Sequence, residues 1–118
     1  MAKVIEIDQT IHDVGLFDSR TGEACMTEKV IDITDDCPGL IDEQAILIFT
    51  RDSRRRIAQI FCPYPTDPSQ GTHIHFSVDQ IDREMNVRPE DDTFGSTAHD
   101  LGLTKVQLRD LILLHAPA

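Results

Sequence analysis

The sequence predicts an α+β fold, because strand patterns come first in the chain and helix patterns come last. Apolar and polar residues alternate in residues 3–8 and at the end of the extended segment 23–34, and residues 44–50 form a short, continuous run of strand-forming residues. We therefore expect an antiparallel β-sheet of about five strands within residues 3–76. Two or three C-terminal helices within residues 77–116 would cover one face of that sheet.

Composition limits the class of protein. The chain has 118 residues and is 40% hydrophobic, which predicts a single domain over residues 1–118, strand-rich in 1–76 and helical in 77–116. No apolar run approaches the roughly 18 residues of a membrane-spanning helix, and the N-terminus has no signal-peptide pattern, so we expect a cytoplasmic protein that does not contact membranes. Three cysteines without a C-x-x-C pair predict reduced thiols, and no cofactor is expected.

The first strand is predicted by Ile5 and Ile7, which lie on one face while acidic residues occupy the other. A weaker strand pattern follows in residues 12–18, and a Gly-containing turn leads into the extended segment 23–34. These two segments flank the turn as the arms of a hairpin would. A Pro-Gly pair at residues 38–39 then ends the strand.

The clearest hairpin consists of residues 44–50 and 55–62, joined by a turn at residues 51–54. Because the first arm is apolar throughout, it predicts a central strand that is buried on both faces. Residues 63–72 contain three prolines and a glycine, which predicts a loop. Residues 73–77 are short and extended.

Two helices are predicted by their start signals. Ser77 and Gln80 have the spacing of a capping box, which predicts a helix over residues 78–87. The same spacing recurs at Thr104 and begins the clearest helix, which ends near His115.

The last predicted helix is apolar around most of its circumference. We expect Leu108 and Leu111 to be fully buried. Such a helix is typical of a protein core or of a homodimer interface, so a homodimer formed through the C-terminal helix is one expectation.

Charge is distributed unevenly along the chain. Residues 1–50 contain 3 basic and 11 acidic residues, a net charge of −8, whereas residues 51–118 contain 8 basic and 10 acidic residues. Strand alternation would place several acids together on the outer face of the sheet, opposite the buried isoleucines. These residues are Glu6, Asp8, Glu28 and Asp32.

The acidic face favours a small, non-catalytic binding or regulatory protein that docks on a basic surface of a protein partner. An inhibitor or a DNA-mimicking protein would have this size and charge. Binding to nucleic acid is not expected for a chain with 21 acidic and 11 basic residues, because phosphates repel it. The chain contains no G-x-S-x-G elbow and no phosphate-binding glycine loop that would indicate catalysis.

The main alternative concerns residues 96–114, in which Ala98, Gly102 and Leu108 occupy the small, turn and core positions of a two-helix unit. This segment resembles the turn and second helix of a helix-turn-helix. The resemblance implies a DNA-binding regulator, with residues 78–87 as the preceding helix. The side chains expected to face DNA are Thr104, Lys105 and Arg109.

Two other clusters are candidate sites. His73 and His75 are two residues apart on a strand, so both side chains would lie on one face and could bind a metal ion in an enzyme or a metal sensor. Four arginines at one hairpin turn would suit an anion or an acidic segment of the same chain. They are Arg51, Arg54, Arg55 and Arg56.

Overall fold

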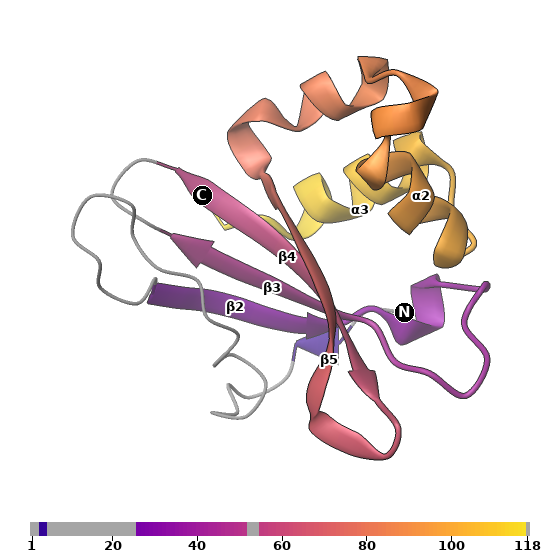
Figure 1. Cartoon of the computed structure of the whole chain (residues 1–118). Coiled ribbons are helices and arrows are strands. Elements are labelled where there is room, and N and C mark those ends of the chain that lie inside the picture. Colours follow the sequence, from indigo (N-terminus) through magenta and orange to yellow (C-terminus); the bar gives the residue numbers. More distant parts are fainter. Residues whose placement is uncertain (1–2, 5–25, 52–54, 118) are drawn as a thin grey trace.

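A computed structural model describes residues 3–4, 26–51 and 55–117 of the chain. Its strands form one antiparallel sheet in which spatial order follows chain order (Figure 1). The strands are β1 (Lys3–Val4), β2 (Met26–Asp32), β3 (Ile46–Arg51), β4 (Arg56–Tyr64) and β5 (Asp67–Ser77). The expected strand over residues 12–18 lies outside the described residues, as do Glu6, Asp8 and Arg54.

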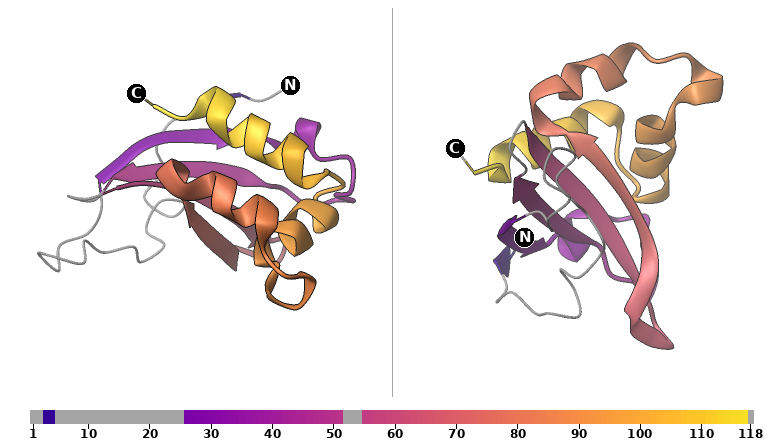
Figure 2. Two further views of the ribbon diagram at one scale, coloured as in Figure 1. Left: turned by 90° about the horizontal axis from the view of Figure 1, so that it is seen from above. Right: turned by 60° about the vertical axis from the view of Figure 1, so that its left-hand side comes forward.

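Apart from one short helix between β2 and β3, the helices follow the sheet in the chain and pack on one of its faces (Figure 2), which confirms the α+β prediction. Among the described residues, three are 3-10 helices and two are α-helices. They are η1 (Thr34–Asp36), η2 (Val78–Asn86), η3 (Pro89–Asp91), α2 (Thr93–Asp100) and α3 (Lys105–His115). No helix among the described residues is long and apolar enough to cross a membrane.

The predicted hairpin of β3 and β4 is confirmed, with Ile46 opposite Phe61 and Arg51 opposite Arg56. The loop predicted over residues 63–72 is wrong, because β4 continues to Tyr64 and β5 begins at Asp67. Prolines are tolerated here for two reasons: β5 is an edge strand, and the register shifts next to Pro63.

The capping box predicted at Thr104 is present. The Thr104 hydroxyl accepts a hydrogen bond from the Gln107 backbone N–H, and the Gln107 side chain accepts one from the Thr104 N–H. The box predicted at Ser77 is absent, since Ser77 makes no side-chain capping bond and the segment after it is a 3-10 helix. The helix that precedes the Gly102 turn is α2, not residues 78–87 as expected.

The main core lies between the sheet and the helices. Phe76 of β5 and Phe94 of α2 pack edge to face, with ring centroids 4.9 Å apart. From α3, Leu108 and Ile112 are fully buried, but Leu111, expected to be fully buried, is only partly so. The α-helical period of 3.6 residues explains this, because it turns Leu108 and Ile112 toward the sheet and Leu111 to the side.

The sheet is buried on its other face as well. Alternation along the central strands places a second apolar cluster there, consisting of Val30, Ile46, Ile48 and Phe61. In β2 the register shifts between Thr27 and Lys29. A regular strand would place the side chains of Glu28 and Asp32 on this same face, because side chains alternate between the two faces. The register shift interrupts that alternation at Glu28.

Candidate functional site

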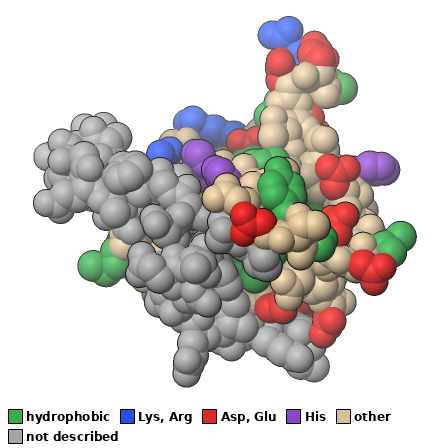
Figure 3. Space-filling model, turned by 60° about the horizontal axis from the view of Figure 1, so that its bottom comes forward, with side chains coloured by type: hydrophobic (Ala, Val, Ile, Leu, Met, Phe, Trp, Pro, Cys, Tyr) green, Lys and Arg blue, Asp and Glu red, His purple; other side chains and the backbone are tan. Residues whose placement is uncertain are grey.

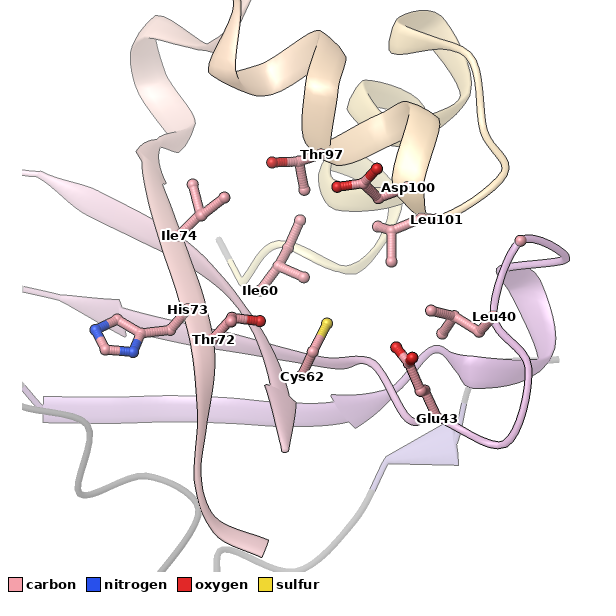
Figure 4. Close-up of a pocket in the computed structure, with 11 residues that line it drawn as sticks. Leu40, Glu43, Ile60, Cys62, Thr72, His73, Ile74, Thr97, Asp100 and Leu101 are labelled. Atoms are coloured by element: carbon pink, nitrogen blue, oxygen red, sulfur yellow. The ribbon is translucent and has the colours of Figure 1, made fainter. Parts of the chain in front are cut away.

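A pocket of about 350 Å³ opens between β4, β5, the loop before β3 and the C-terminal end of α2 (Figure 4). Its apolar lining consists of Leu40, Ile60, Ile74 and Leu101. Glu43 comes from the loop and Asp100 from the end of α2, so two carboxylates from distant parts of the chain line the same space. The combination of apolar walls and carboxylates suits a ligand with an apolar stem and a positive charge.

Cys62 of β4 adds a thiol to this pocket, near both carboxylates (Figure 4). Burial raises the pKa of the Cys62 thiol most, and the negative charges of Glu43 and Asp100 raise it further. A hydrogen bond with Thr72 acts in the opposite direction and lowers it. Since the thiolate is the nucleophile, a raised pKa makes Cys62 a lining group rather than a reactive one.

Two further hollows adjoin this pocket. One shares Ile74, Thr97 and Asp100 with it and extends along η3, and the other shares Glu43 and extends to Tyr64. We call the three hollows together the acidic groove. Its carboxylates come from three separate segments and are Asp42, Glu43, Glu90, Asp91, Asp92 and Asp100.

The acidic groove is not neutralised locally. None of the described residues that line it is a Lys or an Arg. Of its carboxylates, only Asp92 forms an ion pair within the described part of the chain, with the Lys105 ammonium at 2.9 Å. In Figure 3, acidic side chains are spread along the right-hand edge of the described surface below the projecting tip at the top. A concave surface lined in this way concentrates negative potential.

The loop before β3 is held against the end of α2 by its backbone. The Gly39 N–H donates a hydrogen bond of 3.1 Å to the Leu101 carbonyl, which fixes one wall of the groove on the other. Farther along this loop Asp42 has a φ of 56°, a left-handed conformation that is unusual for a residue other than glycine. Ile41 beside it is 80% exposed, and Tyr64 in the same hollow as Asp42 is 49% exposed.

The sequence-predicted acidic face is only partly described, and its described members have local partners. Glu28 Oε1 accepts a hydrogen bond of 3.0 Å from Arg51 Nε, so this acid pairs with a member of the predicted arginine cluster. Asp32 Oδ1 accepts a bond of 2.9 Å from the Thr34 N–H and a second from the Thr34 hydroxyl, which together begin η1.

The described arginines of the cluster do not converge on one empty site. Arg56 binds Asp79 through two guanidinium bonds, at 2.6 and 3.1 Å, and donates a third to the Pro117 carbonyl. The hydrogen bonds that Asp79 accepts from the Arg56 guanidinium, and then the one from the Arg56 backbone N–H, hold the pKa of Asp79 below its usual range. Arg55 lies exposed just before β4.

The residues expected to face DNA also make contacts within the chain. Lys105 pairs with Asp92, and Arg109 lies 3.1 Å from Asp110 and 3.8 Å from Asp82. Thr104 uses its hydroxyl to cap α3. A helix, a turn at Gly102 and the helix α3 are present, but the preceding helix is α2 and not residues 78–87, and the two cations are paired within the chain.

The histidines lie on the face of β5 that is turned away from the helices. His75 is opposite Gln59 and His73 is opposite Phe61, and Figure 4 shows the His73 ring directed away from the pocket. Burial lowers the pKa of His75, and the charges of Arg55 and His73 lower it further. Within the described ranges, no group of three or more His, Cys, Asp or Glu side chains is placed to hold a metal ion.

Sequence reasoning missed the acidic groove because its carboxylates are separated along the chain. The available signal was the pair of acidic clusters next to predicted turns, at residues 42–43 and 90–92. Comparison with protein-family models, with curated proteins and with solved structures gives no match, so the argument for a function depends on the groove alone.

Proposed function

We propose that this chain is a small, non-catalytic binding or regulatory protein that docks on the basic surface of a protein partner, with the acidic groove as the docking site. The observation that carries the proposal is the lining of the groove, in which carboxylates from three segments meet without a Lys or an Arg among the described lining residues. Such a field steers a cationic partner toward the groove and favours the correct orientation.

The neighbouring contacts support a groove that remains negative. Two cations of the last helix are already engaged within the chain: Lys105 neutralises Asp92 of the groove, and Arg109 lies against Asp110. Among the described residues, neither Glu43 nor Asp100 forms an ion pair within the chain. A positively charged group from outside would therefore meet carboxylates that have no competing partner.

The rim of the groove supports a macromolecular partner over a small cation. Ile41 and Tyr64 are large, exposed side chains next to the carboxylates of Asp42 and Glu43. Protein interfaces commonly combine aromatic and apolar anchors with a polar surround. A simple ion would make no use of these side chains.

The chemistry of the groove favours binding over catalysis. Its cysteine is held in the neutral form by burial and by Glu43 and Asp100, so the group that would be the natural nucleophile is suppressed. The same carboxylates that would attract a cationic partner thus oppose thiolate formation.

The test compares two double variants that remove the same charge. Glu43→Gln with Asp100→Asn removes two of the six carboxylates of the groove, whereas Glu84→Gln with Asp82→Asn removes two acids that do not line it and leaves the pair of Arg109 and Asp110 intact. Each protein is immobilised, incubated with cell lysate at low salt and eluted with about 0.5 M salt, at which surface charges are screened within a few ångström. We expect the groove variant to lose specific proteins that the control variant still retains. Identical sets of proteins from both variants would refute the proposal.

A further inference from the structure

Among the described strands, none is paired with the outer edge of β5. This strand is the last in the sheet order, and β4 pairs with its other edge from Gly71, opposite Pro63, to Ser77, opposite Ile57. Within the part of the chain that the structure describes, no backbone hydrogen bond connects the outer edge of β5 to another segment. Its N–H and C=O groups at that edge are available to a further strand.

Beyond Asp67 and Pro68 at its start, this edge also lacks the usual protection against strand addition. Natural edge strands are commonly blocked by Lys or other charged residues, by Pro, or by a bulge. The segment from Gln70 to Ser77 contains no Lys, Arg, Asp, Glu or Pro. The register shift in this hairpin lies at the other end of the strand pair, between Pro63 and Tyr64.

One hollow of the acidic groove lies beside this edge. Among the described residues that line the hollow, Ile74 is the only one from the sheet, and the rest come from η3, α2 and the residues next to them. A strand added to β5 would lie about 4.8 Å from it, and its helix-facing side chains would extend on the same side of the sheet as Ile74, which lines this hollow together with Asp91 and Asp100. The other side of the added strand would lie next to His73 and His75.

We propose that the partner contributes an extended basic segment that binds by adding a strand to the free edge of β5. This inference rests on the proposed function of the acidic groove and specifies the partner's chemistry. Because side chains alternate along a strand, every second residue of the segment would face the groove. The segment therefore has Lys or Arg at alternate positions, and its backbone forms hydrogen bonds with β5.

The test uses synthetic nine-residue peptides and the full chain. The parent peptide alternates Lys and Thr, and a matched peptide of the same composition has its lysines in one block. Two derivatives of the parent are N-methylated, one at the Lys residues and one at the Thr residues. In a strand, the N–H groups of alternate residues point to opposite edges, so only one derivative loses the bonds toward β5. Binding is measured by fluorescence anisotropy at low salt.

We expect one methylated peptide, which loses four or five N–H donors on the side of β5, to bind at least about tenfold more weakly than the parent, while the other binds as the parent does. Losing only one or two net hydrogen bonds would already give about this effect. The block peptide should also bind more weakly.

If both methylated peptides match the parent, strand addition is refuted. If a peptide nevertheless loses binding to the Glu43→Gln, Asp100→Asn variant, the acidic groove keeps its proposed function. If no peptide binds, strand addition is refuted and the lysate comparison alone decides the proposed function.

Discussion

Gly39 and Gly102 contact each other backbone to backbone, and this contact joins the two walls of the acidic groove. A Cβ atom on Gly102 would lie 2.3 Å from the Gly39 nitrogen, and one on Gly39 would lie 2.6 Å from the Gly102 nitrogen. Gly102 also has a φ of 77°, which side chains other than glycine rarely adopt. The loop that carries Glu43 can therefore approach the turn that follows Asp100 only if both positions lack a side chain.

Replacing Gly102 with alanine should destabilise the protein by about 2–3 kcal/mol. The substitution combines an unfavourable positive φ with a backbone clash against Gly39. Urea unfolding at constant pH measures the change in the free energy of unfolding. A loss below about 0.5 kcal/mol, the usual range for surface positions, would show that the two segments separate without cost.

The Gly39→Ala variant tests whether both glycines act through the same contact. Once one substitution has opened the contact, the second should cost less, so the double variant should be more stable than the sum of the single effects implies. A deviation from additivity larger than about 0.5 kcal/mol is expected. Additive effects would mean that each alanine strains the chain independently.

Local signals were sufficient to predict much of the fold. The extended segment of β2, the apolar run of β3 and the capping box at Thr104 each depend on neighbouring residues, and each was predicted correctly. The continuation of β4 and β5 was missed because prolines and glycine normally break strands. Here Gly71 allows the backbone of Cys62 and Pro63 to approach closely, with a Cβ position only 2.3 Å from the Cys62 carbonyl oxygen.

The acidic groove was beyond sequence reasoning for a different reason. Its acids at 42–43, 90–92 and 100 belong to three segments whose separate patterns give no sign of proximity. What brings them together is the close approach of Gly39 and Gly102, which are 63 positions apart. A single sequence indicates that each glycine favours a turn, but it does not indicate which turn meets which.

Replacing Leu108 with alanine should cost on the order of 2–5 kcal/mol, because the side chain is fully buried between α3 and the sheet. Leu114, which is 76% exposed on the same helix, is the matched control. Its replacement should change the free energy of unfolding by less than about 0.5 kcal/mol. Equal effects in denaturant unfolding would contradict the observed orientation of α3.

The pairing of Asp92 with Lys105 should make stability sensitive to acid. The hydrogen bond from the Lys105 ammonium, and then that from the Gly95 N–H, hold the pKa of Asp92 below its usual range. A carboxyl whose pKa is lower in the folded state stabilises that state above the unfolded pKa of about 4, and this stabilisation is lost as pH falls through the folded pKa. Asp92→Asn should therefore lower stability at pH 7 and weaken its decline in acid. Thermal unfolding across this pH range measures both effects, and Asp91→Asn is the control. If the stability of the parent and of Asp92→Asn declined equally in acid, the pairing of Asp92 with Lys105 would not be the cause.

Cys62 should report the charge of the acidic groove through its reactivity. Glu43 and Asp100 raise the pKa of its thiol, so the Glu43→Gln, Asp100→Asn variant should have more thiolate near pH 8 and react faster with iodoacetamide. Cys37 is buried, its pKa is raised to about 12, and it should stay slow in both proteins. Peptide mass spectrometry distinguishes the cysteines. An unchanged rate at Cys62, or the same acceleration in the Glu84→Gln, Asp82→Asn control, would show that the groove carboxylates do not act on the thiol.

Duplex DNA should not bind tighter than about 10 µM at physiological salt, whereas specific DNA-binding proteins reach about 10⁻⁸ M or better. The α2 and α3 helices are joined by a turn at Gly102, as the helix-turn-helix alternative requires, but phosphate binding also requires available cations. To bind phosphate, Lys105 would have to break its ion pair with Asp92, and Arg109 its ion pair with Asp110. Glu90 and Asp91, which line the same hollow as Asp92, would also repel the phosphates. Titration of a labelled, randomised duplex at low and moderate salt tests this. Saturable, salt-sensitive binding that disappears in Lys105→Ala and Arg109→Ala variants would instead assign α3 to DNA recognition and leave the acidic groove without its proposed role.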